Sequence, residues 1–131
     1  MMMSKFEKYR AVPMILVMGT IFLLSHQPGD ALDLPSIPGL DKAGHFGIYG
    51  LLAASVVLAH RSGSRKNNPW RVCLATLAVC LVYGISDEFH QSFIPGRFVS
   101  GADVLADMAG AVTVLSGWMI SLKKGICRSV T

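Results

Sequence analysis

The chain has few charged residues for its length. Only 15% of its 131 residues are Asp, Glu, Lys or Arg, whereas 52% are hydrophobic. A soluble domain carries about 25% charged residues, and its apolar residues recur on one face of each helix or strand. Here the apolar residues form continuous blocks instead. The composition therefore disfavours a soluble globular domain and predicts one polytopic membrane domain over residues 1–131.

Cysteine is also scarce, and its spacing excludes a disulfide framework. Cys73 and Cys80 lie in one apolar run, and Cys127 lies in the basic tail. Two helical positions seven residues apart are about two turns apart, which is too far for a disulfide bond. No CxxC pair is present to bind a structural metal ion. We interpret the cysteines as packing residues.

The sequence lacks the short motifs of several common enzyme classes. It contains no glycine-rich phosphate loop, no GxSxG nucleophile elbow and no HExxH pair. The first absence excludes ATP hydrolysis by a phosphate-loop mechanism, and the second excludes the α/β-hydrolase mechanism. Any chemistry must therefore come from residues brought together by the fold.

Four apolar runs predict an all-α fold, a polytopic antiparallel bundle of four transmembrane helices. The predicted spans cover about residues 9–25, 41–60, 70–93 and 101–122. The first run could instead be a signal peptide, but it ends in Ser25-His26-Gln27-Pro28 without a small-x-small cleavage site. A retained first span is therefore favoured. Asp41 is the predicted N-cap of the second helix.

Basic residues at the ends of the apolar runs predict the orientation. Most lie before the first run, between the second and third, or after the fourth: Lys5, Lys8, Arg10, Arg61, Arg65, Lys66, Arg71, Lys123, Lys124 and Arg128. The positive-inside rule then places both termini in the cytoplasm. This distribution explains the net charge of +4 and the pI of about 9.2 without nucleic-acid binding. The opposite side holds the loop acids Asp30 and Asp33.

Polar residues concentrate near the predicted extracytoplasmic side. The stretch 86–107 holds Asp87, Glu88, His90, Gln91, Arg97, Asp103 and Asp107. An ionisable side chain at mid-membrane costs roughly 2.5–3.5 kcal/mol, and less near the surface. A sequence keeps such groups where they pair, face a wet cavity or take part in chemistry. We therefore expect the functional site here.

The second predicted helix contributes Lys42, His45 and Tyr49. Their three-then-four spacing places them on one stripe that runs inward from the membrane surface. The alternative interpretation is a lysine that extends to the surface and a histidine that a neighbouring helix satisfies.

The third predicted helix carries Asp87 and Glu88 near its C-terminal end. Anions there oppose the helix dipole, so helix stability does not explain them. Asp87 shares a face with His90 and Gln91, which predicts a carboxylate–imidazole pair that orients His90 for acid–base chemistry. The alternative is a polar knot that only fixes helix packing.

The fourth predicted helix begins after Ser100, its predicted N-cap. Asp103 at the third helical position resembles the acidic member of a capping box. Asp107 lies a full turn deeper, where capping cannot explain it, and Gly110 continues the stripe and allows close helix approach. Arg97 is the predicted partner of Asp103 or Asp107, or else binds a phosphate or carboxylate through its planar guanidinium.

A metal site is the less favoured interpretation of these groups. Suitable ligand types for Zn²⁺ or Mg²⁺ occur at His45, His90, Glu88, Asp103 and Asp107. No local ligand spacing links them, and they come from three helices. We therefore expect neither a metal ion nor a cofactor.

The order and spacing of the polar motifs resemble the VanZ-like family of bacterial integral membrane proteins. The matching motifs are Asp41-Lys42-x-x-His45-Phe46-x-x-Tyr49, Ser86-Asp87-Glu88-Phe89-His90-Gln91, Pro95-Gly96-Arg97, and Asp103 with Asp107-x-x-Gly110. The resemblance covers most of the chain and implies a cell-envelope role in the bacterial cytoplasmic membrane. The family's name member is associated with low-level resistance to the glycopeptide antibiotic teicoplanin.

Three functions follow as alternatives, each with the lipid bilayer as partner and with the oligomeric state left open. The first is a cavity that binds an anionic, lipid-linked or glycopeptide envelope ligand through Lys42, Tyr49, Gln91, Arg97 and Asp103. The second is a membrane-embedded acid/base enzyme on the same ligand class, with candidate catalytic residues His45, Asp87, Glu88, His90 and Asp107. The third is a scaffold whose polar knot fixes packing and partner contacts.

Overall fold

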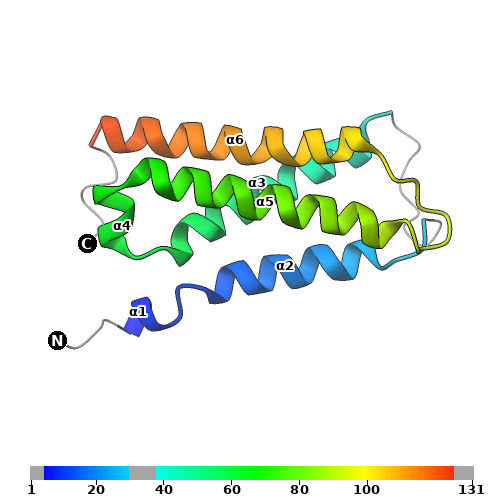
Figure 1. The fold of residues 1–131 in the computed structure, drawn as a ribbon, viewed down its shortest axis with the longest axis horizontal. Helices are drawn as coiled ribbons and strands as arrows, with labels where there is room; N and C mark the ends of the chain where they lie inside the picture. The colour runs from blue at the N-terminus through cyan, green and yellow to red at the C-terminus, as the bar shows by residue number, and fades with distance from the viewer. Residues whose placement is uncertain (1–4, 30–37, 126–131) are drawn as a thin grey trace.

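The computed structural model describes residues 5–29 and 38–125, and these residues form a helical bundle without strands. Four longer helices lie side by side and alternate in direction along the chain: α2 (Val12–Ser25), α3 (Leu40–Ala59), α5 (Pro69–Gln91) and α6 (Gly101–Lys123) (Figure 1). The short helices α1 (Lys5–Lys8) and α4 (Ser62–Asn67) lie at one end. The predicted all-α membrane bundle is confirmed. Asp30, Asp33, Cys127 and Arg128 lie outside the described residues.

Three helices, α3, α5 and α6, are long and apolar enough to cross a membrane. Helix α2 is apolar but has only 14 residues. At 1.5 Å per residue it is about 21 Å long, against a hydrocarbon core of about 30 Å. The helix predicted over residues 9–25 is therefore shorter than expected. Pro13 has no N–H to continue the helix backward, so α2 begins at Val12 and the preceding residues form α1.

The other helix ends show one wrong and one confirmed cap. Gly39, not Asp41, is the N-cap of α3, and its φ of 83° is the left-handed conformation that glycine adopts readily. Asp41 lies in the first turn, where its negative charge favours the helix dipole. Helix α5 ends at Gln91, two residues before the predicted end at 93. The predicted N-cap Ser100 is confirmed, because its Oγ accepts a hydrogen bond from the Ala102 N–H at 3.2 Å.

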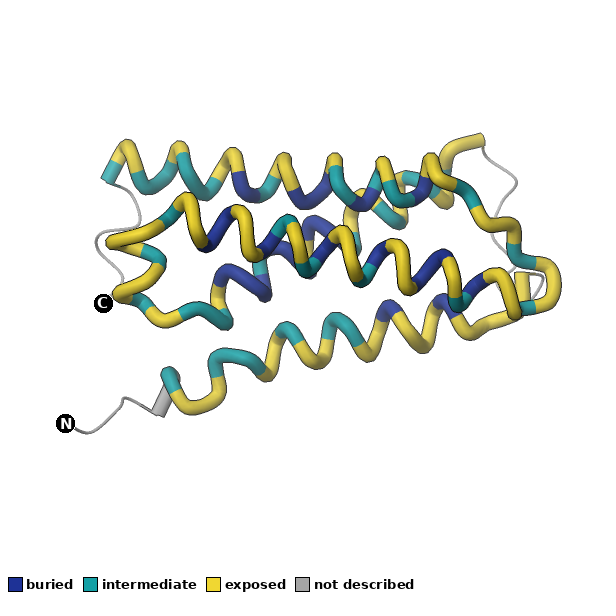
Figure 2. The backbone as a smooth tube through the Cα atoms, viewed as in Figure 1, coloured by how far each residue is buried: buried dark blue, intermediate teal, exposed yellow. Residues whose placement is uncertain are grey.

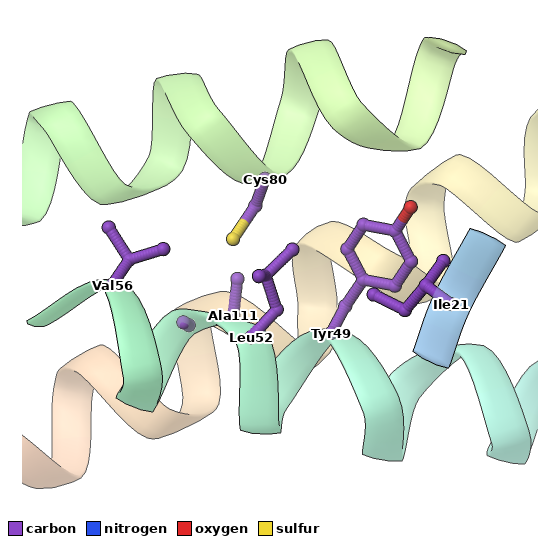
Figure 3. Close-up of a cluster of buried hydrophobic side chains, with 7 residues drawn as sticks. Ile21, Tyr49, Leu52, Val56, Cys80 and Ala111 are labelled. Atoms are coloured by element: carbon purple, nitrogen blue, oxygen red, sulfur yellow. The ribbon is translucent and has the colours of Figure 1, made fainter. Parts of the chain in front are cut away.

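The apolar core lies between the inner faces of the four longer helices. Tyr49 and Leu52 from α3 and Cys80 from α5 point toward one another (Figure 3). A second buried cluster includes Cys73 and Leu115. Both described cysteines are buried and unpaired, which confirms their predicted packing role.

The outward surface of the bundle is also apolar. Leu16, Leu74 and Leu105 are 64%, 65% and 71% exposed, although all three lie within apolar helices. Figure 2 shows that buried positions face the centre of the bundle and exposed positions face outward. A continuous apolar surface of this kind is suited to the hydrocarbon of a bilayer, which identifies the lipid as its surroundings.

The two ends of the bundle differ in charge. The end of α2, the beginning of α3, the end of α5 and the beginning of α6 meet at one end (Figure 1). This end carries most of the described acids, and we call it the acidic end. The opposite end carries Arg10, Arg61, Arg65, Lys66, Arg71, Lys123 and Lys124. The charge separation agrees with the orientation predicted from the sequence, which stays a prediction.

The close approach of α3 and α6 gives a stability prediction. A Cβ on Gly110 of α6 would overlap the carbonyl of Phe46 in α3. Gly110→Ala should therefore force the helices apart and lower the free energy of unfolding by about 1–3 kcal/mol. Denaturant-induced unfolding of the purified protein in detergent measures this change.

Gly117→Ala is the matched control on the same helix. Within residues 5–29 and 38–125, no atom lies within 4 Å of a Cβ added there, so alanine should be neutral or stabilise the helix by up to about 1 kcal/mol. Equal destabilisation by the two substitutions would show that the close approach at Gly110 is not required.

Candidate functional site

Polar side chains from the four longer helices converge at the acidic end of the bundle. Three of the helices supply what we call the polar cluster: Lys42, His45 and Tyr49 of α3, Asp87, Glu88 and Gln91 of α5, and Asp103 and Asp107 of α6. All except Lys42 and His45 are buried. Buried carboxylates require partners because an unpaired charge in an apolar environment is strongly destabilising.

Each acid of α6 in the polar cluster pairs with a basic side chain of α3. Lys42 Nζ lies 2.8 Å from Asp103 Oδ1, and His45 Nδ1 lies 2.9 Å from Asp107 Oδ1. Helices α3 and α6 both begin at the acidic end and run in the same direction. Residues about one turn apart on α3 therefore face residues one turn apart on α6. Lys42 also contacts Asp41 at the helix start, 3.2 Å away.

Arg97 does not pair with Asp103 or Asp107, so that prediction is wrong. Its Nε donates to the carbonyl of Gln27 at 3.0 Å, and its Nη2 donates to the carbonyl of Leu24 at 2.8 Å. The last carbonyls of a helix have no partner inside the helix and attract a cation. Arg97 therefore holds the C-terminal end of α2, and α3 supplies the bases for the acids of α6.

Glu88 takes the place of the predicted capping box. Its Oε2 accepts a hydrogen bond from the backbone N–H of Ser100 at 2.8 Å. In a capping box within α6, Asp103 would accept this bond, but the Asp103 carboxylate pairs with Lys42 instead. The prediction for Asp103 is therefore wrong. A side chain of α5 satisfies the N-terminus of α6 and links the two helices.

Asp87 does not orient His90, which is a further correction. Asp87 Oδ2 accepts from Gln91 Nε2 at 3.1 Å, and the same nitrogen lies 3.3 Å from Ser25 Oγ of α2. His90 instead lies with His26, their Nε2 and Nδ1 atoms 3.2 Å apart. Three residues along a helix leave a side chain about 60° from its predecessor. His90 is thus turned toward α2, and the fourth residue, Gln91, faces Asp87.

Three oxygens of the polar cluster have no hydrogen-bond partner among the described residues. They are the Tyr49 hydroxyl, Glu88 Oε1 and Asp107 Oδ2. Glu88 is 4% exposed, and Asp107 is fully buried. Leaving such a group unsatisfied costs about 1–3 kcal/mol, and more when it is charged. Contacts among the described residues therefore do not satisfy every polar group of the cluster.

A cavity of about 330 Å³ opens beside the polar cluster, between α2, α3 and α5. Its apolar lining includes Ile21, Leu24, Leu40 and Ile48. Its polar lining consists of Ser25, Asp41, His45, Tyr49, Asp87, Gln91 and Arg97. Of the predicted ligand-binding residues, Tyr49, Gln91 and Arg97 line the cavity, whereas Lys42 and Asp103 are not part of its lining. A cavity lined by both apolar and polar side chains suits an amphiphilic ligand.

Sequence reasoning missed two residues of this region. Ser25 is buried and bonds to Gln91. In the sequence, its position indicated only where the first apolar run ends. Gly84 lies against Asp107, because a Cβ there would be 2.8 Å from Asp107 Oδ2. A glycine three residues before Asp87 in an otherwise apolar helix was the available signal for close approach.

The contact between Glu88 and Ser100 predicts a difference between two substitutions. Glu88→Ala should lower the free energy of unfolding by about 1–3 kcal/mol, because the Ser100 N–H loses its acceptor. Glu88→Gln keeps an acceptor oxygen at the same reach and should cost less. Thermal unfolding in detergent, followed by circular dichroism, measures both. Identical losses would mean that the hydrogen bond to Ser100 does not stabilise the start of α6.

Comparison with known protein families confirms the resemblance found in the sequence. The family model described as VanZ/LLP1 matches residues 10–122, which span all four of the longer helices as far as Leu122. No curated protein and no solved structure matches the chain significantly. Because the family match covers most of the sequence, the chain belongs to the VanZ/LLP1 family of membrane proteins.

Proposed function

We propose that the protein binds an amphiphilic ligand of the bacterial cell envelope, with an anionic head group, in the cavity between α2, α3 and α5. The observation that supports this function is the mixed apolar and polar lining of the cavity. Ile21, Leu24 and Ile48 offer apolar contacts, and Tyr49 and Arg97 offer hydrogen-bond donors. The acyl or isoprenoid part of a ligand would lie against the apolar side chains, and its head group against the polar ones.

The head group would be held by Arg97 rather than by Lys42. Lys42 Nζ already lies 2.8 Å from Asp103 and 3.2 Å from Asp41, so its charge is neutralised. Arg97 donates to two carbonyls through Nε and Nη2, and among the described contacts its Nη1 donors remain available. The buried acids Asp87 and Asp107 repel an anion. The head group would therefore stay at the Arg97 rim, with the apolar part inside.

The charge distribution supports an extracytoplasmic position for this cavity. The basic residues gather at the opposite end of the bundle, and the positive-inside rule assigns that end to the cytoplasm of a bacterial inner membrane. A ligand that reaches the cavity would then come from the outer leaflet. Lipid-linked envelope precursors combine an apolar chain with a polar head. Teicoplanin-like glycopeptides, which the resistance associated with the family's name member suggests as ligands, do so as well.

Two glycines of α3 provide a matched test of ligand binding. Gly44 lines the cavity and Gly47 does not, and no atom of the described residues lies within 4 Å of a Cβ added at either position. Gly44→Leu should fill the cavity and reduce co-purified envelope lipid by about tenfold or more, since 1.4 kcal/mol of lost contact energy is tenfold in affinity. Gly47→Leu should leave the bound lipid unchanged. Mass spectrometry of lipid retained by the purified proteins measures this ratio.

Equal lipid content in the Gly44→Leu protein and the wild type would overturn the cavity as the binding site. Thermal unfolding of both variants shows whether each is folded. Helix propensity favours leucine over glycine at both sites, so neither substitution should destabilise α3.

A second candidate function rests on the contact between His45 and Asp107. Asp107 is fully buried and its Oδ1 accepts from His45 Nδ1 at 2.9 Å, while His45 also lines the cavity. A carboxylate that fixes the imidazole in this way leaves Nε2 for proton transfer to a bound substrate. This geometry supports a membrane-embedded acid/base enzyme with His45 as its base or acid. His90, which contacts His26 outside the cavity lining, is not supported in that role.

Substitution of His45 separates catalysis from binding. If the protein is an enzyme, His45→Gln should keep the co-purified lipid but lower its conversion by about 10² to 10⁴-fold. Lipid extracts of cells that express each variant, compared by mass spectrometry, measure the conversion. His60→Gln is the control, because His60 bonds to the Val56 carbonyl far from the cavity. Full conversion by the His45→Gln protein would rule out His45 as the acid or base and would leave ligand binding as the supported function.

A further inference from the structure

We propose that His45, Asp87 and Glu88 form a binding site for one divalent transition-metal ion, with Zn²⁺ as the preferred ion. Each of the three residues offers one ligand atom, and these atoms lie within 4.8 Å of one another. They come from two helices, α3 and α5, whose packing brings them together at the acidic end. This site is independent of the proposed envelope ligand, because it requires only an ion.

The three ligand atoms lie close enough together for one small ion to bind all of them. Oxygen and nitrogen ligands of Zn²⁺ lie about 2.0–2.2 Å from the metal in a tetrahedral arrangement, so two ligand atoms on one ion are about 3.3–3.6 Å apart. A pair of ligand atoms separated by the full 4.8 Å would approach by about 1.2–1.5 Å on binding, which rotation of the Asp and Glu side chains can supply.

The surroundings of His45 match those of a metal-bound histidine. Such a histidine uses one ring nitrogen for the metal and donates the other N–H to a carboxylate, which fixes its orientation. Here His45 Nδ1 lies 2.9 Å from Asp107 Oδ1, and Nε2 is the nitrogen left for an ion. Asp107 thus orients the metal-binding imidazole.

Glu88 supplies the second, independent observation. Its Oε2 accepts from the Ser100 N–H at 2.8 Å, but its Oε1 is buried and has no partner among the described residues. Glu88 is only 4% exposed. The structure therefore fixes this carboxylate by one oxygen and leaves the other oxygen buried without a partner among the described residues, an arrangement suited to a metal ligand.

The charge balance of the polar cluster also favours a cation. Four carboxylates are buried there: Asp87, Glu88, Asp103 and Asp107. Among the described residues, Lys42 neutralises Asp103, and Arg97 bonds to backbone carbonyls. The imidazole of His45 is the remaining base in contact with these acids. A divalent ion would balance the excess negative charge at this depth in the membrane, where an unpaired carboxylate is costly.

The ligand set selects the kind of ion. One imidazole nitrogen and two carboxylate oxygens suit Zn²⁺ or Mn²⁺, and the general affinity order places Zn²⁺ above Mn²⁺. Mg²⁺ and Ca²⁺ prefer oxygen ligands alone. His45 and Asp87 also line the cavity, which gives the ion a path of entry and leaves a coordination position open toward it.

Direct titration tests the site. The full chain, purified in detergent with a tag that contains no histidine, is stripped with EDTA and titrated with zinc chloride by calorimetry. Dialysed samples are analysed by elemental mass spectrometry. We expect saturable binding of one Zn²⁺ per chain, weaker binding of Mn²⁺, and a rise in the unfolding temperature with Zn²⁺ concentration.

Four variants separate this site from other polar groups. Glu88→Gln, which keeps an acceptor for Ser100, and Asp87→Asn should each weaken Zn²⁺ binding by about tenfold or more. Loss of an outer-shell partner already costs about 10- to 100-fold in metal affinity, and loss of a direct ligand should cost at least as much. His90→Gln removes the surface pair with His26, which is the most obvious adventitious zinc site, and should retain binding. Asp103→Asn removes a buried carboxylate outside the ligand set and should lower the unfolding temperature without loss of bound zinc.

Two results would overturn the proposal. One is the absence of saturable zinc binding by the folded wild-type chain, which needs no variant to interpret. The other is binding that persists in Glu88→Gln and Asp87→Asn but disappears in His90→Gln, which would assign the ion to the surface pair. Neither result bears on the lipid content of the Gly44→Leu and Gly47→Leu proteins, so the envelope-ligand proposal is tested separately.

Discussion

The pairing of α3 with α6 is the interaction on which the rest of the structure depends. The two helices start at the same end, and Lys42 and His45 meet Asp103 and Asp107 in matching register. This register requires the backbones to approach closely, which the absence of a side chain at Gly110 permits. Apolar contacts alone drive little association between helices in lipid, so the ion pairs and close packing together define the arrangement.

The remaining two long helices are held to this pair at the acidic end. Glu88 of α5 caps α6 through the Ser100 N–H, and Arg97 in the following turn caps the end of α2. Gln91 links α5 to Ser25 of α2. The polar residues thus satisfy helix termini as well as one another. A purely structural knot would satisfy all its members, whereas Tyr49, Glu88 and Asp107 each keep a buried oxygen without a partner in the described structure.

These unpaired oxygens connect the structural and the functional interpretations of the polar cluster. Tyr49 lines the cavity together with His45, Asp87 and Gln91, so residues that order the bundle also form the polar part of the cavity lining. Within this arrangement His45 is the central residue, because it contacts Asp107, lines the cavity and belongs to the candidate metal set. Acid/base chemistry and metal coordination would both use its second ring nitrogen, which explains why one site supports both alternatives.

The sequence by itself determined the all-helical membrane bundle, the N-cap at Ser100 and the family, because continuous apolar runs and local motifs act over a few residues. It also located the polar residues of the site. Only the tertiary structure decided their partners: Arg97 binds carbonyls of α2, Lys42 takes Asp103, and Asp87 bonds to Gln91 rather than to His90. Helical spacing places a side chain on a face, but the neighbouring helix, its direction and its register decide what that face meets, and these depend on contacts some sixty residues apart in the chain.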